Sequence, residues 1–253
     1  MIKIVPTVLA NTEAEFGMKL RKLLKVADEL QFDIMDGKFV PSMSIPIHQI
    51  PEVRRYRKRF EAHLMVQNPG AYIQPMARRG IKRILFHVEP LSDRTIRNLI
   101  DLCRKHKMEV VLAINPETPV SKLLPYVKLI DGVLFLGVHP GFNGAPYVAK
   151  TPARIKEFVR KNSNPALVVQ VDGGMTPKTI AAVVAAGATR INSGSFVSNA
   201  PDPAKALRQL YAAVPVAKPA AKPKTRTAAS PKRAPAKRIG KIVKTKLSKW
   251  TSK

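Results

Sequence analysis

Short apolar runs alternate with segments of helical periodicity along the first 214 residues. Eight of these runs are rich in β-branched and apolar residues and end in polar loops, which is typical of buried strands. Between them, apolar residues recur at three- and four-residue spacing, which predicts helices. The predicted strands are 2–9, 30–35, 60–66, 83–88, 109–114, 132–138, 166–171 and 189–193, and the predicted helices include 13–26, 95–105, 177–186 and 203–214.

This strict alternation indicates the fold class. Eight consecutive strand–helix units in a chain segment of this length fit a closed barrel, whereas an open doubly wound sheet usually contains fewer strands. Neither a G-x-G-x-x-G fingerprint nor a Walker loop is found in the sequence, which disfavours nucleotide binding. We therefore expect an α/β protein whose residues 1–214 form a (β/α)8 TIM barrel.

After residue 214 the composition changes to a mixture of Lys, Ala and Pro. Residues 215–253 hold 13 of the 44 basic residues and no acidic residue, and they contain little that could form a core. This composition predicts a disordered basic extension. Within it, apolar residues at helical spacing over 239–250 predict a short amphipathic helix that forms on contact with a partner.

Charge and composition limit the classes of protein to consider. The net charge is +27, and the 45% of hydrophobic residues excludes disorder throughout. Thirteen tail charges favour non-specific binding of nucleic acid or of an anionic membrane surface, and a merely solubilising extension is an equal alternative. The sequence has no apolar window of 18 residues and no secretory signal, so we expect a soluble cytoplasmic protein; a homo-oligomer is left open.

The single cysteine agrees with a reducing compartment. Cys103 has no second cysteine with which to form an internal disulfide, and it cannot build a cysteine-based metal site. We expect it to be a small hydrophobic residue on a helical face.

Polar residues gather at the predicted strand ends. Thr7, Asp33, His63 and Asp172 lie at or near the carboxyl ends of the first, second, third and seventh strands, where barrels carry their chemistry. Two carboxylates and one imidazole thus converge on one mouth. Glycines in the loops after strands seven and eight are consistent with phosphate binding by backbone N–H groups, although each pair alone is also common in turns.

Seven motifs carry a resemblance to a known family. They are PTVLA (6–10), FDIMDGKFVP (32–41), HLMVQNP (63–69), INPETP (114–119), VHPGFNG (138–144), VDGGMTP (171–177) and NSGSFV (192–197). In this order they resemble the motif set of ribulose-phosphate 3-epimerases, over residues 1–214 and not over the tail. The resemblance implies a ribulose-phosphate-binding barrel that interconverts D-ribulose 5-phosphate and D-xylulose 5-phosphate through an enediolate.

The resemblance also implies a metal site. In the family one divalent metal ion, zinc, iron or manganese, is held by two His and two Asp, and the two Asp are also the catalytic acid and base. Asp33, His63 and Asp172 match three of these positions, and Asp33 and Asp172 match the acid–base pair. Gln31 stands where the family has its other His. Because an amide oxygen is a weaker, neutral ligand, Gln31 predicts looser metal binding or a changed metal preference.

The remaining implied residues would contact the substrate. Met35 and Met65 match methionines that line the pocket in the family. The substrate- and phosphate-binding positions carried over by the motifs are Thr7, His63, Gly141, Phe142, Asn143, Gly144, Gly173, Gly174, Gly194 and Ser195. Two alternatives stay open: an epimerase for another ketose phosphate such as an allulose 6-phosphate, or a catalytically weak barrel whose tail binds nucleic acid.

Other polar residues receive plainer interpretations. We expect Asp36 to order the loop after the second strand through hydrogen bonds to the backbone. His87 and His139 are interpreted as structural or solvent-facing. Nothing in the sequence selects Glu61 or Glu89 for a role beyond a solvated or paired charge.

Overall fold

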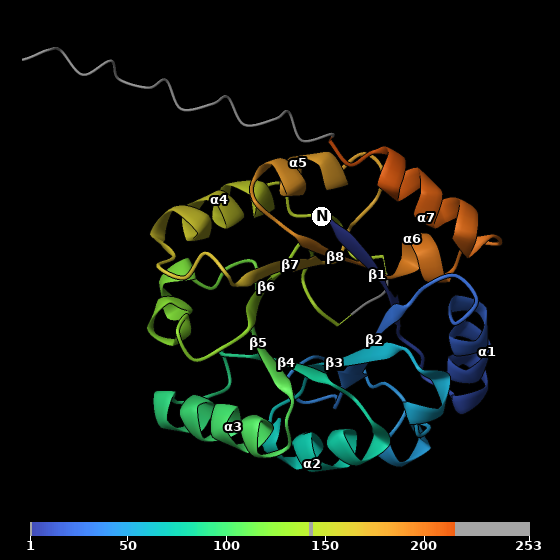
Figure 1. Cartoon of the computed structure of the whole chain (residues 1–253), viewed down its shortest axis with the longest axis horizontal. Coiled ribbons are helices and arrows are strands. Elements are labelled where there is room, and N and C mark those ends of the chain that lie inside the picture. The colour runs from blue at the N-terminus through green and yellow to red at the C-terminus, as the bar shows by residue number, and fades with distance from the viewer. Residues whose placement is uncertain (1, 142–143, 216–253) are drawn as a thin grey trace, which may run out of the picture. The chain divides into compact units, whose positions relative to one another are not determined.

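Eight parallel strands close into a barrel in a computed structural model that describes residues 2–141 and 144–215. The strands follow one another around the barrel in chain order, and β1 also pairs with β8. Figure 1 shows helices arranged around these strands. The strands are β1 (Lys3–Val8), β2 (Glu29–Met35), β3 (Arg59–Met65), β4 (Arg83–His87), β5 (Glu109–Ile114), β6 (Gly132–Leu136), β7 (Val168–Asp172) and β8 (Arg190–Ser193).

Three of the helices begin at a residue whose side chain caps the first turn. Thr12, Ser92 and Asp202 each accept a hydrogen bond from a first-turn N–H and so satisfy a donor that has no partner within the helix. The α-helices are α1 (Glu13–Leu23), α2 (Gly70–Arg79), α3 (Asp93–Lys105), α4 (Thr151–Lys161), α5 (Ile180–Ala185), α6 (Ser195–Ser198) and α7 (Pro203–Ala212). Short 3-10 turns are η1 (Ile47–Gln49), η2 (Arg54–Tyr56), η3 (Val120–Lys122) and η4 (Leu124–Tyr126).

Buried apolar residues form two main clusters inside and around the barrel, and a small third cluster contains Met35, Val40 and Met65. The larger main cluster includes residues of both strands and helices and contains buried aromatics such as Phe32, Phe60 and Phe135. A separate cluster on β4, β5 and β6 consists of Leu85, Val111, Ala113, Leu134 and Leu136. Because side chains alternate along a strand, each of these three strands contributes to both main clusters.

The predicted TIM barrel is confirmed, and the predicted strands and helices agree with the structure apart from their ends. The predicted strand 132–138 ends earlier, at Leu136. The next residue, Gly137, lies so close to the backbone of Gly173 that any side chain there would collide with the Gly173 carbonyl oxygen. The predicted helix 177–186 begins only at Ile180, since Thr179 donates its hydroxyl to the Gly174 carbonyl in the preceding turn.

The predicted tail and its helix over 239–250 lie outside the described residues. Among the residues that are described, no helix is both long and apolar enough to cross a membrane. Cys103 is buried, as expected, and burial raises the pKa of its thiol to about 12.

Candidate active site

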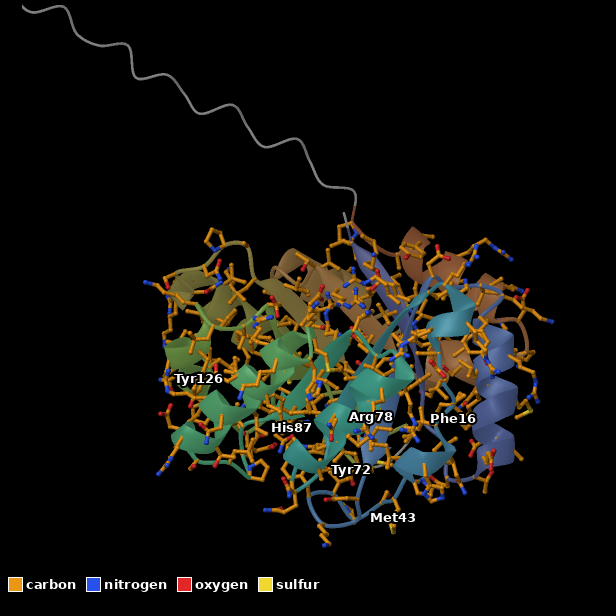
Figure 2. The ribbon with its side chains drawn as sticks, turned by 60° about the horizontal axis from the view of Figure 1, so that its bottom comes forward. Phe16, Met43, Tyr72, Arg78, His87 and Tyr126 are labelled. Atoms are coloured by element: carbon orange, nitrogen blue, oxygen red, sulfur yellow. The ribbon has the colours of Figure 1, made fainter. Side chains whose placement is uncertain are left out.

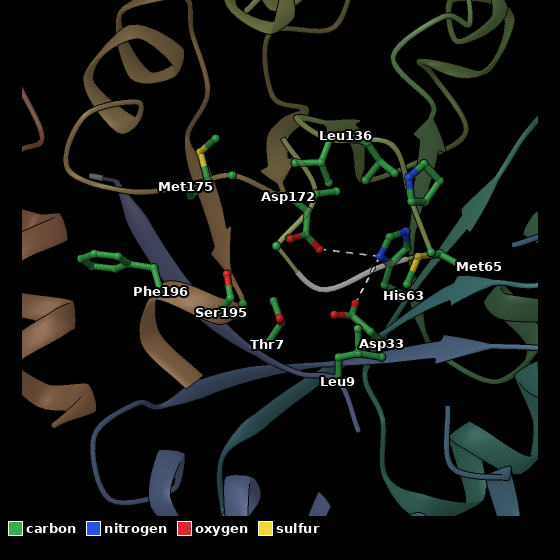
Figure 3. Close-up of a pocket in the computed structure, with 18 of the residues that line it drawn as sticks. Thr7, Leu9, Asp33, His63, Met65, Leu136, Asp172, Met175, Ser195 and Phe196 are labelled. Carbon is green, nitrogen blue, oxygen red and sulfur yellow. Dashed lines mark hydrogen bonds and ion pairs between the residues drawn. The ribbon is translucent and has the colours of Figure 1, made fainter. Parts of the chain in front are cut away.

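Asp33, His63 and Asp172 meet at the carboxyl ends of β2, β3 and β7. Asp33 and His63 are paired in the register of neighbouring strands, so their side chains point to the same face of the sheet. His63 Nδ1 lies 3.3 Å from Asp33 Oδ1 and 3.6 Å from Asp172 Oδ2. All three side chains are buried, and Figure 3 shows the imidazole beside the two carboxylates, with a dashed line to each.

Burial and mutual charge change the acid–base properties of this group. Burial, followed by repulsion from Asp172, raises the pKa of Asp33 above its usual value. Burial acts to lower the pKa of His63, but hydrogen bonds and attraction to Asp172 and Asp33 outweigh it and raise the pKa to about 9. Asp33 is therefore easier to protonate than an exposed aspartate, as proton transfer near neutral pH requires.

The same three side chains could hold a metal ion. Each offers one ligand atom, and these atoms lie within 4.8 Å of one another. Carboxylate oxygens and an imidazole nitrogen suit zinc, iron or manganese. The fold thus brings together three of the four metal ligands that the resemblance implies.

Gln31, the fourth implied position, does not direct its oxygen at this group. Its side-chain nitrogen donates to Asp33 Oδ1 over 2.7 Å and to Asp172 Oδ2 over 2.6 Å, while its oxygen accepts from Asn192 Nδ2. An amide nitrogen with its protons has no lone pair to give to a metal. The set of four ligands implied by the resemblance therefore does not fit this geometry.

A layer of polar side chains lies beside Gln31 inside the barrel. Glu61 Oε1 accepts from Gln170 Nε2 over 2.6 Å and from Asn192 Nδ2 over 2.7 Å. Its other oxygen accepts from Arg190 over 2.8 Å and from Arg83 over 3.1 Å. Glu61 is only 1% exposed, so these four bonds supply the partners that a buried carboxylate needs.

A second histidine contacts the site from β4. His63 Nε2 lies 3.0 Å from His87 Nε2, and His87 Nδ1 lies 3.1 Å from Glu89. Burial lowers the pKa of His87, although the hydrogen bond to Glu89 opposes this. A neutral His87 that donates from Nδ1 accepts the Nε2 proton of His63, which fixes the orientation of that ring.

One pocket contains every described residue that the sequence assigned to substrate. Its lining comes from several strand ends, and Figure 3 shows Thr7, His63, Met65 and Ser195 around it. Phe142 and Asn143 lie outside the described residues. The assigned residues that line the pocket are Thr7, Asp33, Met35, His63, Met65, Gly141, Gly144, Asp172, Gly173, Gly174, Gly194 and Ser195.

Glycines allow the strand-seven loop to approach its neighbours closely. Gly173 and Gly174 have φ values of 91° and 69°, a left-handed conformation that side chains rarely adopt. A Cβ on Gly173 would lie 2.5 Å from Val138. The pocket wall here is consequently backbone, which can offer N–H groups to an anion.

The loop after β2 is ordered by Asp36, as expected. Asp36 Oδ1 accepts from the N–H groups of Lys38 and Phe39, and Oδ2 accepts from that of Gln67. Burial acts to raise the pKa of Asp36, but these backbone bonds lower it below the usual value. Met43 on the same loop is 64% exposed and projects at the edge of the molecule in Figure 2.

The polar layer was not predicted from the sequence, although one signal points to it. Gln31, Glu61 and Gln170 each precede an assigned site residue by two positions. On a strand that spacing places both side chains on the same face. His87 was interpreted as structural or solvent-facing; it is fully buried against His63, whereas His139 is exposed and pairs with Glu117.

Comparisons with known proteins agree with this site. The model of the ribulose-phosphate 3-epimerase family matches residues 3–198. The cytoplasmic isoform of ribulose-phosphate 3-epimerase from Oryza sativa subsp. japonica is 32% identical, over 84% of this chain and 94% of its own length. The ribulose-phosphate 3-epimerase of Schizosaccharomyces pombe is 34% identical, over 82% of this chain and 92% of its own length.

Solved structures show the same fold at lower identity. A 3-hexulose-6-phosphate synthase is similar with a TM-score of 0.65 and 18% identity, over 85% of this chain and all of the other. An orotidine 5'-phosphate decarboxylase from Pyrococcus horikoshii has a TM-score of 0.58 and 15% identity, over 83% and 98% of the two chains. At these identities the likeness concerns the barrel alone.

Proposed function

Since the chain belongs to the ribulose-phosphate 3-epimerase family, we propose that it inverts C3 of a ketose phosphate, interconverting D-ribulose 5-phosphate and D-xylulose 5-phosphate. The observation that carries the proposal is the pair of buried carboxylates, Asp33 and Asp172, which both approach His63 Nδ1 and line one pocket. Epimerisation needs two such groups, because one proton leaves one face of C3 and another arrives at the opposite face.

Each aspartate acts on one face of the substrate. One carboxylate removes the proton α to the C2 carbonyl, and the planar enediolate then receives a proton from the other aspartate in its acid form. Reversal of the reaction exchanges the two roles. The raised pKa of Asp33 supports this assignment, because it favours a carboxyl group that carries a proton between turnovers.

The substrate's phosphate end is assigned to the part of the pocket that follows β7 and β8. Gly173, Gly174, Gly194 and Ser195 line the pocket there. Backbone N–H groups in this part of a barrel are a common phosphate site. Met35 and Met65 offer apolar surface near the carboxylates, suited to the carbon skeleton of the intermediate.

A divalent ion held in this site would supply positive charge that stabilises developing negative charge on the substrate. The donors suited to zinc, iron or manganese are Asp33, His63 and Asp172. Because Gln31 turns its nitrogen toward them, we assign no step of the reaction to a metal.

Hydrogen exchange at C3 tests the function. The purified full-length protein is incubated with D-ribulose 5-phosphate in deuterated water, and C3 deuteration and xylulose 5-phosphate are followed by NMR. We expect both to appear together. Exchange with an allulose 6-phosphate but not with ribulose 5-phosphate would move the proposal to that substrate, and no exchange with either would overturn it.

A cytoplasmic location is proposed with the activity. The relative from Oryza sativa subsp. japonica that is named a cytoplasmic isoform supports it. Cell fractionation with an antibody to the chain tests this location directly.

A further inference from the structure

The amide group of Gln31 lies between the two carboxylates of the site. Its nitrogen is 2.7 Å from Asp33 Oδ1 and 2.6 Å from Asp172 Oδ2, which uses both of its protons. These are also the two carboxylate oxygens that face His63 Nδ1. Gln31 is fully buried, so its amide meets protein groups on every side.

The orientation of this amide is set from the far side by Asn192 and Glu61. Asn192 Nδ2 donates to Gln31 Oε1 over 2.6 Å and to Glu61 Oε1 over 2.7 Å. Gln170 Nε2 donates to the Asn192 oxygen over 2.7 Å and to Glu61 Oε1. Because the Glu61 carboxylate is paired with two arginines and can only accept, every donor in this chain points in a determined direction.

The opposite orientation is unfavourable at both ends. Turning the Gln31 amide over would place its oxygen against two carboxylate oxygens and its N–H groups against those of Asn192. Turning Asn192 as well would place its oxygen against Glu61. Each choice leaves buried acceptors facing acceptors, and buried polar groups without partners are costly.

This arrangement competes with a metal ion. An ion placed between Asp33 and Asp172 on the Gln31 side would compete for the oxygens that Gln31 binds, and the amide N–H groups offer it no lone pair. The N–H groups also direct partial positive charge toward that position, which opposes a cation there. The three-ligand group is therefore closed on its fourth side by a hydrogen-bond donor.

We propose that Gln31 is a positioning residue that holds Asp33 and Asp172 together through its amide N–H groups, and that this bridge replaces a divalent metal ion in the chain. The positioning role rests on the proposed function, in which the two aspartates exchange protons with the substrate. The exclusion of the metal rests on the hydrogen-bond network alone. The two parts are accordingly tested by different measurements.

Metal affinity tests the exclusion. The full-length protein, Gln31→Leu and Gln31→His are treated with chelator, desalted and titrated with Zn²⁺ and Mn²⁺ by calorimetry. Gln31→Leu removes the N–H bridge with little change in size, so we expect it to bind zinc more tightly than wild type. We expect Gln31→His, which adds a ligand, to bind at least about tenfold more tightly. Affinity in Gln31→Leu that is equal to or weaker than that of wild type would show that the bridge does not exclude the ion and would overturn the proposal.

Gln74→His is the matched control, because it introduces a histidine at an exposed position of α2 away from the site. It is expected to leave zinc affinity unchanged. The metal affinity of the wild-type protein can be measured even if a substitution at Gln31 reduces folding.

Turnover tests the positioning role. We expect wild-type C3 exchange to persist in the presence of chelator, and Gln31→Leu to lower kcat about 10- to 100-fold with KM nearly unchanged, since substrate contacts remain. Loss of wild-type exchange in chelator, with recovery on adding Zn²⁺, Mn²⁺ or Fe²⁺, would overturn the proposal. If wild type shows no exchange under any condition, the proposed function fails, while the order of the zinc affinities still decides whether Gln31 excludes the ion.

Discussion

Two halves of the barrel interior differ in chemistry. Strands β4, β5 and β6 supply an apolar half, and β2, β3, β7 and β8 supply most of a polar half, which His87 and Arg83 of β4 also contact. Several hydrogen bonds of the polar half join strands that are not neighbours in the sheet. The apolar half is Leu85, Val111, Ala113, Leu134 and Leu136. The polar half is Gln31, Asp33, Glu61, His63, Gln170, Asp172, Arg190 and Asn192.

The difference shows what each half contributes. Apolar packing stabilises the barrel but has no preferred direction of hydrogen bonding. In the polar half, each donor must find an acceptor, so the orientation of a side chain is determined by groups on distant strands. The polar half can therefore hold two carboxylates at a defined separation, and the apolar half cannot.

The largest effect is expected from removing an acid–base group of the polar half. Asp33→Asn or Asp172→Asn keeps the side-chain shape but removes the titrating group, so C3 exchange should fall by about 10²- to 10⁴-fold. NMR of C3 deuteration measures this loss. Asp101→Asn, at an exposed position of α3, is the control and should keep the wild-type rate. Full activity in both site variants would remove the aspartates from the mechanism.

Breaking the buried ion pairs below the site should mainly reduce stability. Glu61→Gln leaves Arg83 and Arg190 without one of their partners, and we expect a loss of about 4 kcal/mol in the free energy of unfolding. Urea titration measures it. The exposed pair of Glu52 and Arg54 is the control, because Glu52→Gln should cost less than about 1 kcal/mol. Equal losses in the two variants would contradict the special role of the buried pair.

A cavity in the apolar half should reduce stability without reducing catalysis. Leu134 is fully buried, and Leu134→Ala should cost about 3 kcal/mol through lost burial and the cavity it leaves. The rate of C3 exchange per folded molecule should remain that of wild type. Leu129→Ala, at a position 40% exposed, should have little effect on either quantity. A large fall in the rate for Leu134→Ala would mean that the two halves are coupled.

The sequence was sufficient for the barrel and for the three charged site residues. The strands are visible because buried parallel strands read as apolar runs, and Asp33, His63 and Asp172 stand at predicted strand ends within motifs. Glu61 was not distinguished from an ordinary paired charge. Its partners include Asn192, which is 131 residues away, and no local pattern brings such residues together.

The direction of the Gln31 amide could not be predicted either. From the sequence alone, the amide is expected to turn its oxygen toward a metal ion, because only the oxygen has a lone pair to give. In the structure the orientation of the amide is determined by its partners. Asn192 on β8 donates to the Gln31 oxygen, and the carboxylates of Asp33 and Asp172 accept from the Gln31 nitrogen. That outcome depends on the closure of the barrel, which is a property of the whole chain.

The smallest effect concerns pH, and it separates the two halves without a change of sequence. The pKa of His63 is raised from 6.5 to about 9 in the folded protein, so its contribution to stability is complete below pH 6.5 and is lost as the pH rises through 9. Within that window the free energy of unfolding should fall by about 1.4 kcal/mol per pH unit. Urea titrations at about pH 6.5, 7.5 and 8.5 in buffer with chelator measure the slope. His63→Asn should remove this slope, whereas His48→Asn, at an exposed position, should retain it. A slope unchanged in His63→Asn would show that the imidazole is not held protonated by the two carboxylates, and the polar half would then stabilise the barrel through neutral hydrogen bonds and the Glu61 ion pairs.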